Sequence, residues 1–254
     1  MNLGFEGKTV IVTGGTKGIG SGISTVFAQE GANLIIDYRS DVEGSEAFIK
    51  GLVDEYGVEA YGIQADVSKL EDIVRIFDFA EEKFGRLDVL INNAGESPTT
   101  MTWDLSLDEW NDQLANNVTG QFLMSKEFAV RNMAKGQGGH IVNLLSKASE
   151  TTTTKGRAAY VTNKTAELGL TRQLAVDLTD KGFIVCGVEP GSVLSQMMGG
   201  MTEEQLAARA KRCPLGRINT PVEMGYYVAW LASDKNQVVI GCGADATAGM
   251  LLGF

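Results

Sequence analysis

The chain has 254 residues, of which 44% are hydrophobic and 21% are charged. This composition can fill the core of one large domain and differs from that of disordered chains. The net charge of -10, from 22 Lys and Arg against 32 Asp and Glu, disfavours binding to nucleic acid or to an anionic membrane surface. The three cysteines are isolated and His140 is the only histidine, which argues against a disulfide framework and leads us to expect no metal site.

The sequence also has no apolar run of membrane-spanning length, and its first residues lack the basic and then apolar pattern of a signal peptide. We therefore expect a soluble, cytoplasmic protein. Its expected partner is a small molecule, with no nucleic acid and no membrane.

Short apolar runs rich in β-branched residues recur along the chain, and longer segments with helical periodicity separate them. The runs cover residues 9–13, 33–37, 60–65, 88–93, 140–146 and 183–188. Their hydrophobicity is continuous rather than alternating, which is typical of strands covered on both faces. The pattern predicts an α/β fold with a doubly wound parallel sheet and helices on both faces, Rossmann-like, in a single domain over residues 1–254.

One helix start is marked by a capping-box pattern. Ser106 is followed three residues later by Glu109, before an apolar periodic segment. We predict a helix that carries residues 110–133.

A glycine-rich turn follows the first predicted strand. Residues 13–20 read Thr-Gly-Gly-Thr-Lys-Gly-Ile-Gly, and glycine allows tight bends and close approach of the backbone to a ligand. Amide groups at the start of the next helix favour a phosphate group even in an acidic protein. This turn therefore indicates a dinucleotide site, although a glycine-rich turn that only packs is the alternative reading of the motif alone.

Tyr160 and Lys164 stand four residues apart, so on a helix they share one face. A neighbouring cation stabilises a phenolate and makes a phenol a better proton donor and acceptor near neutral pH. Tyr160 is therefore a candidate general acid toward a ketone and a candidate general base toward an alcohol. The pair is common on ordinary amphipathic helices, so its meaning depends on the motifs around it.

These motifs, in this order, resemble those of the short-chain dehydrogenase/reductase family, including its NADP(H)-dependent β-ketoacyl-carrier-protein reductases. The turn has the family's TGxxxGIG form, residues 92–95 read Asn-Asn-Ala-Gly, and Asp66 precedes Val67 after the third strand. Residues 190–193 read Pro-Gly-Ser-Val and are followed by Ser195, where the family more often has threonine. The resemblance extends along nearly the whole chain.

The resemblance implies a set of cofactor-binding residues. They are Gly14, Thr16, Lys17, Gly18, Ile19, Gly20, Tyr38, Arg39, Asp66, Val67, Asn93, Ala94, Gly95, Tyr160, Lys164, Pro190, Gly191, Val193 and Ser195.

Cofactor choice depends on the end of the second strand. The family's acidic, NAD-selecting position falls on Tyr38, and its basic position, which accommodates the 2′-phosphate of NADP, falls on Arg39. Lys17 matches a second basic position. NADP(H) is therefore favoured, and NAD(H) is the alternative, because a shift of one residue in register would place Asp37 at the selecting position.

The resemblance also implies four catalytic residues: Asn117, Ser146, Tyr160 and Lys164. The serine hydroxyl would orient the substrate oxygen, and Asn117 would help to hold a water beside the lysine. The assignment of Asn117 rather than Asn116 depends on its distance to Gly120. The implied reaction is hydride transfer between the cofactor and a ketone or secondary alcohol.

Residues 194–215 correspond to the family's flap over the substrate and contain Met197, Met198 and Met201. Methionines adapt to apolar shapes, which favours an apolar, acyl or steroid-like substrate. Lys147, Lys155 and Arg157 in the polar loop before Tyr160 could instead bind an anion, or be solvated charges. A dinucleotide-sensing regulator and a lyase or epimerase on the same scaffold are the alternative functions.

Three further points come from comparison with the family pattern. Ser146 and Tyr160 are one residue further apart than is common, and residues 241–243 and 247–249 replace the family's TGQ and DGG. The second departure leaves the local packing near the C-terminus open. The family resemblance also implies a homotetramer or a dimer, formed by the long helices and a C-terminal strand.

Overall fold

The computed structural model describes residues 2–151, 154–194 and 200–251. They form one parallel sheet of seven strands in the order β3-β2-β1-β4-β5-β6-β7. The strands are β1 (Thr9–Val12), β2 (Asn33–Tyr38), β3 (Ala60–Gln64), β4 (Val89–Asn92), β5 (Gly139–Leu144), β6 (Phe183–Pro190) and β7 (Gly243–Ala246). The predicted doubly wound, Rossmann-like single domain is confirmed.

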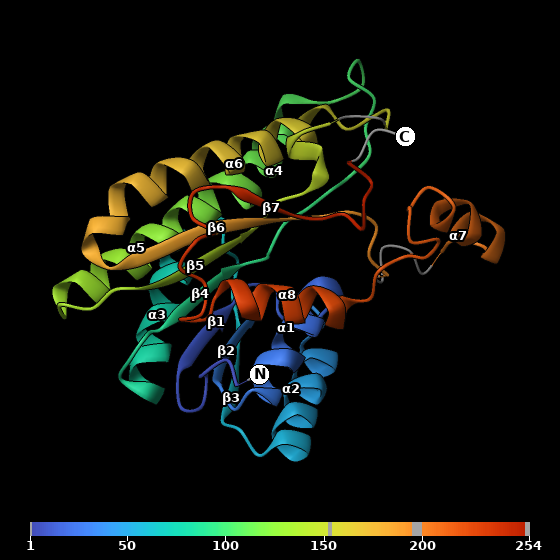
Figure 1. The fold of residues 1–254 in the computed structure, drawn as a ribbon. Coiled ribbons are helices and arrows are strands. Elements are labelled where there is room, and N and C mark those ends of the chain that lie inside the picture. Colours follow the sequence, from blue (N-terminus) through green and yellow to red (C-terminus); the bar gives the residue numbers. More distant parts are fainter. Residues whose placement is uncertain (1, 152–153, 195–199, 252–254) are drawn as a thin grey trace.

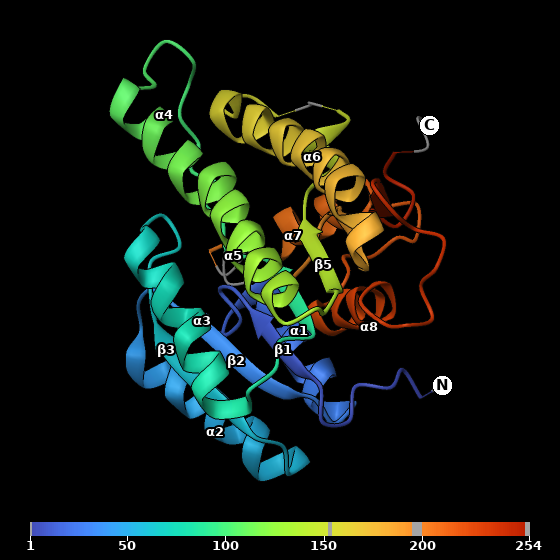
Figure 2. The ribbon, with the colours of Figure 1, turned by 90° about the vertical axis from the view of Figure 1, so that its left-hand side faces the viewer.

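Helices cover both faces of this sheet (Figures 1 and 2). They are α1 (Gly18–Gln29), α2 (Val42–Tyr56), α3 (Leu70–Phe84), α4 (Leu107–Leu114), α5 (Gly120–Ala134), α6 (Ala158–Leu178), α7 (Glu203–Ala210) and α8 (Pro221–Leu231). Helices α1, α2 and α8 lie on one face, and α3, α5 and α6 lie on the other. Helix α7 projects beyond the sheet in Figure 1.

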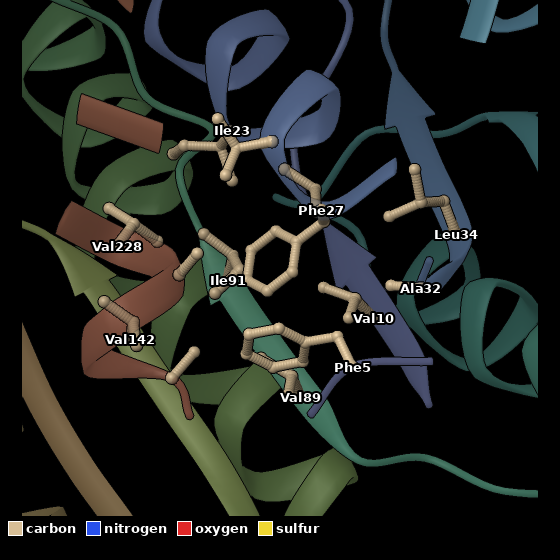
Figure 3. Packing of buried hydrophobic residues seen from close by; sticks show 14 of the residues in the cluster. Phe5, Val10, Ile23, Phe27, Ala32, Leu34, Val89, Ile91, Val142 and Val228 are labelled. Carbon is tan, nitrogen blue, oxygen red and sulfur yellow. The ribbon is translucent and has the colours of Figure 1, made fainter. Parts of the chain in front are cut away.

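The core is divided between these two faces because successive side chains of a strand point to opposite sides. Val10 and Val12 of β1 pack with Phe27 of α1, and Figure 3 shows this cluster around Phe5 and Phe27. Ile11, between the two valines, packs on the opposite face with Phe77 of α3. The continuous apolar runs of the sequence thus reflect burial on both faces.

All six predicted strands are present, and β7 is a seventh. Its sequence, Gly-Ala-Asp-Ala, has too little β-branched character to stand out. The helix predicted over residues 110–133 is present as an unbroken helical run, in which a π-helical turn, η1 (Ala115–Thr119), lies between α4 and α5. The predicted capping box is half formed: the Ser106 side chain accepts from the Glu109 amide, while the Glu109 carboxylate accepts from the Thr100 hydroxyl.

The strand order places a crevice at the carboxyl ends of the strands. The chain passes from β1 outward to β2 and β3 and then returns to β4 on the other side of β1. The loop after β1 therefore leads to one side of the sheet and the loop after β4 leads to the other. In open α/β sheets, ligands bind between two such loops.

The departure at residues 247–249 has a local backbone consequence. Ala248, where the family pattern has glycine, adopts a φ of 56°, a conformation that costs a residue with a Cβ more than glycine. Within the described residues, none of the helices has the length and apolar character to cross a membrane.

Candidate active site

A cavity of about 630 Å³ opens at the carboxyl ends of the strands. Most of the predicted site residues line it: Gly14, Thr16, Lys17, Gly18, Ile19, Tyr38, Arg39, Asp66, Val67, Asn93, Ala94, Gly95, Ser146, Tyr160, Lys164, Pro190, Gly191 and Val193. Two predicted residues, Gly20 and Asn117, do not line it, and Ser195 lies outside the described residues. The tertiary structure thus brings the nucleotide motifs and the Tyr160-Lys164 pair into one space.

The glycine-rich turn between β1 and α1 has the backbone that its sequence predicts. Gly14 and Gly18 have φ values of 58° and 53°, in the left-handed region that glycine occupies without strain. Lys17 precedes α1 in an extended conformation, and no side chain caps the helix. The first amides of α1 are therefore free to bind a phosphate group, which fits a dinucleotide.

Gly20 supports this turn rather than contacting the cavity. A Cβ at this position would lie 2.3 Å from the Gly14 carbonyl oxygen and 2.6 Å from Asn93 Nδ2. The residue is therefore needed for the close packing of helix and turn, and its predicted contact with the cofactor stays a prediction.

The Asn-Asn-Ala-Gly segment after β4 ties the turn to the sheet. Asn93 Nδ2 donates to the Thr13 and Gly14 carbonyl oxygens at 2.8 and 3.1 Å. The amides of Asn93 and Ala94 both donate to Thr13 Oγ1, at 2.8 and 2.9 Å. Four hydrogen bonds therefore hold the turn against the end of β4, which preorganises the phosphate site.

Asp37, at the end of β2, does not present its carboxylate to the cavity as a free acceptor. It is 2% exposed, and its Oδ1 accepts from the Gly14 amide at 2.7 Å. Burial raises its pKa to about 7; the Gly14 hydrogen bond opposes this, and nearby Asp66 and Asp72 add to it. Asp37 thus fixes the glycine-rich turn.

The next two residues of this strand end have different surroundings. The Tyr38 hydroxyl donates to Glu46 Oε1 at 2.5 Å, so it points toward α2. Arg39 forms an ion pair with Glu96, and its side chain is 54% exposed. Lys17 Nζ lies 2.6 Å from Asp41 Oδ2. Two cations, each paired with a carboxylate, therefore stand at this end of the cavity.

Tyr160 and Lys164 lie on the first turns of α6. Lys164 Nζ lies 5.9 Å from the centroid of the Tyr160 ring, and Lys164 is 8% exposed. Its Nζ donates to the Leu144 carbonyl at 2.7 Å and to Glu167 Oε2 at 2.8 Å. Since an ammonium has three donors, one N–H remains for a cofactor hydroxyl or a water.

Glu167 is a second buried charge at this site. It is 1% exposed, and its Oε1 has no hydrogen-bond partner among the described residues. Burial opposes the charged form of Lys164, but the charge and hydrogen bond of Glu167, together with the nearby Tyr160, outweigh burial and raise the pKa of Lys164. The carboxylate therefore helps to keep the ammonium charged.

Ser146 lies two residues after the end of β5 and is 9% exposed. Its Oγ accepts from the Ala148 amide at 3.1 Å, which caps the short 3-10 turn η2 (Lys147–Ser149). Because the amide binds an oxygen lone pair, the hydroxyl hydrogen stays available to a carbonyl oxygen in the cavity.

Asn117 acts through the backbone that it holds. Its Oδ1 accepts from the Glu96 amide at 2.8 Å, and its Nδ2 donates to the Glu96 carbonyl at 3.1 Å. These two bonds hold the side chain against the Glu96 backbone, and Asn116 rather than Asn117 lines the cavity. That Asn117 helps to hold a water beside Lys164 stays a prediction.

Sequence reasoning did not assign a role to several residues of the site. Glu96, Asn116, Arg209, Arg212 and Met250 line the cavity, and Glu167 contacts Lys164. Only Glu167 had a local signal, namely its position three residues after Lys164 on the same helix. Among the described residues, no group of three histidine, cysteine or acidic side chains could hold a metal ion.

Helix amides without a side-chain cap, a phenol with a buried ammonium beside it, and a shared cavity at the strand ends are typical of a dinucleotide-dependent oxidoreductase. The chain from residue 14 to residue 250 matches a family model described as Enoyl-(Acyl carrier protein) reductase. Glucose 1-dehydrogenase 2 of Bacillus subtilis is 33% identical over 98% of this chain and 96% of that protein. The 3-oxoacyl-(acyl-carrier-protein) reductase FabG of Staphylococcus aureus is 31% identical over 96% of this chain and 98% of that protein.

A solved structure gives the same result. A short chain dehydrogenase from Burkholderia cenocepacia, in complex with NADP, has a TM-score of 0.88 and 30% sequence identity, over 97% of this chain and 98% of that chain. The chain belongs to the short-chain dehydrogenase/reductase family. It is an NAD(P)-dependent enzyme, as the resemblance in its sequence implies.

Proposed function

We propose that the protein is an NADP(H)-dependent reductase that interconverts a ketone and a secondary alcohol. The observation that carries this proposal is the position of Tyr160 and Lys164, which line the same cavity as the glycine-rich turn. A protein that only sensed the dinucleotide would not require a phenol beside a buried ammonium.

The nicotinamide ring would supply or accept the hydride when the cofactor is bound. The chain's own residues would handle the proton and the substrate oxygen. The Tyr160 hydroxyl gives its proton to the oxygen during reduction and takes it back during oxidation. The Ser146 hydroxyl donates to the same oxygen, and Lys164 stabilises the phenolate and holds a cofactor hydroxyl.

The preference for NADP(H) is supported by Lys17 and Arg39, which stand at the cofactor end of the cavity. Each is paired with a single carboxylate, Asp41 or Glu96, and a 2′-phosphate would compete for these cations. Asp37, the residue that would select NAD(H), is engaged by the Gly14 amide.

A test of selectivity is to compare kcat/KM with NADPH and NADH in the wild type and in Arg39→Gln. We expect the wild type to prefer NADPH, and Arg39→Gln to lose about tenfold or more of this preference, the value of one charge-assisted hydrogen bond. Lys50→Gln, which removes an exposed cation of α2, is the control. A wild-type preference for NADH would contradict the proposal.

The remaining parts of the proposal concern substrate, assembly and location. Met201 and Met250 line the cavity and suit the carbon skeleton of an acyl or steroid-like substrate; Met197 and Met198 lie outside the described residues. Residues 194–215 would act as a flap. Exposed apolar side chains on α5 and α6, including Phe122 and Val176, favour a homotetramer or dimer. A location in the cytoplasm stays part of the proposal, on the sequence pattern alone.

The central experiment is a screen of ketones and secondary alcohols that follows nicotinamide absorbance. We expect net, stoichiometric cofactor turnover, and we expect Tyr160→Phe to reduce it by several orders of magnitude while the dissociation constant of NADPH changes little. A lyase or epimerase would convert substrate without net cofactor change, and a sensor would bind the cofactor alone. Turnover retained in Tyr160→Phe would refute the mechanism.

A further inference from the structure

Four cations line the cavity away from the glycine-rich turn. Lys147 lies in η2, Arg157 precedes α6, and Arg209 and Arg212 come from α7 and the residues after it. In the part of the chain that the structure describes, none of the four forms an ion pair with a carboxylate, in contrast to the Lys17 and Arg39 pairs.

The cations are close enough to repel one another. Burial lowers the pKa of Lys147, and the positive charges of Arg212 and Arg209 lower it further. Gathering like charges in a partly buried place is unfavourable unless an anion joins them. In a chain with a net charge of -10, this concentration of positive charge is local and specific.

The acidic residues that line the cavity do not neutralise this cluster. They are Asp37, Asp66 and Glu96, and each is engaged elsewhere. Asp37 accepts from Gly14, Asp66 accepts from Ser68, and Glu96 pairs with Arg39. Among the described residues, the cavity thus has mixed charge at its cofactor end and positive charge without ion-pair partners at its other end.

The positive end lies beside the reacting groups. Lys147 directly follows Ser146, and the Arg157 guanidinium carbon lies 5.6 Å from the centroid of the Tyr160 ring. Arg157 Nη1 donates to the Ser97 carbonyl at 2.6 Å, which fixes the side chain in place. A guanidinium so held can offer its remaining N–H groups to a carboxylate or phosphate oxygen.

We propose that the substrate carries an anionic group, a carboxylate or a phosphate ester, on the same skeleton as its ketone or secondary alcohol. Arg209, Arg212 and Lys147 bind this anion, and Arg157 contacts its end nearest to Tyr160. Met201 and Met250 then contact the carbon skeleton. This inference rests on the proposed function and replaces a wholly apolar substrate by an amphiphilic one.

The direct test uses the enzyme saturated with NADP⁺, titrated calorimetrically with malonate and, separately, with inorganic phosphate. We expect one of the two to bind, and Arg209→Gln/Arg212→Gln to weaken it about tenfold or more, since charge-assisted hydrogen bonds are lost. Lys155→Gln/Lys211→Gln is the matched control. It removes two exposed cations of the same segments, which do not line the cavity, and should change the affinity less than about twofold.

Turnover provides the second test. Oxo acids are compared with their methyl esters, and a hydroxyketone phosphate with its free alcohol, so that the two pairs distinguish carboxylate from phosphate. We expect kcat/KM for the charged member to exceed that for the neutral member about tenfold or more, and this ratio to fall in the double arginine variant but not in the lysine control.

Three results would overturn the inference. The saturated enzyme could bind neither anion. The arginine variant could bind anions as the wild type does. Finally, the arginine variant could bind NADP⁺ more weakly when no anion is present. In that case these arginines bind the cofactor rather than the substrate. Failure of the proposed function is a different result, namely cofactor turnover that does not depend on Tyr160.

Discussion

The raised pKa of Asp37 gives a prediction about stability whose size follows from the structure. Its carboxyl has an ordinary pKa of 3.8, and burial raises this to about 7 in the folded protein. Between these values the unfolded chain loses the proton while the folded chain keeps it. The stability contribution of the group therefore falls as pH rises from 3.8, and the loss is complete above about pH 7.

Since one pKa unit corresponds to about 1.4 kcal/mol, Asp37 should cost about 3 kcal/mol of unfolding free energy between pH 5 and pH 8. Asp37→Asn removes the titration, and its side-chain oxygen can still accept from the Gly14 amide. The stability of this variant relative to the wild type should therefore increase by about 3 kcal/mol from pH 5 to pH 8.

Urea unfolding followed by circular dichroism, without cofactor, measures this difference at the two pH values. Because the variant and the wild type are compared at the same pH, the contributions of other groups that titrate in this range cancel in the difference of their unfolding free energies. Asp104→Asn is the control, because it removes the same charge from an exposed position and should shift stability by a similar amount at both pH values. A gain in Asp37→Asn that does not change with pH would refute the reasoning, because Asp37 would then already be ionised at pH 5.

Two further predictions concern the glycine-rich turn and the lysine pair. Gly20→Ala should weaken cofactor binding at least about tenfold, because its Cβ would lie 2.3 Å from the Gly14 carbonyl oxygen; Gly51→Ala, in open space on α2, should bind normally and gain up to about 1 kcal/mol of stability. Cofactor fluorescence titration measures the affinity of each variant for the cofactor. Equal affinities in Gly20→Ala and Gly51→Ala would contradict the packing argument. Glu167→Gln should move the pH profile of alcohol oxidation to higher pH, because burial would then lower the pKa of Lys164 and a less charged lysine would stabilise the Tyr160 phenolate less; an unchanged profile in Glu167→Gln would leave Glu167 a structural role only.

The sequence by itself determined the elements and motifs that depend on near neighbours. The apolar runs became strands because burial on both faces requires continuous hydrophobicity. Gly14 and Gly18 adopt positive φ values that glycine permits, and Tyr160 and Lys164 meet because residues four apart share a helix face. These features need no knowledge of the rest of the fold.

Only the tertiary structure decided which distant residues meet. The Gly14 amide binds Asp37, Arg39 meets Glu96, and Arg209 and Arg212 of the α7 segment join Lys147 at the same cavity. Each of these contacts joins separate segments, and charge carries no periodicity along the chain that would reveal it. The parallel sheet brings the strand ends to one edge, and that geometry, rather than any local pattern, sets the charge around the site.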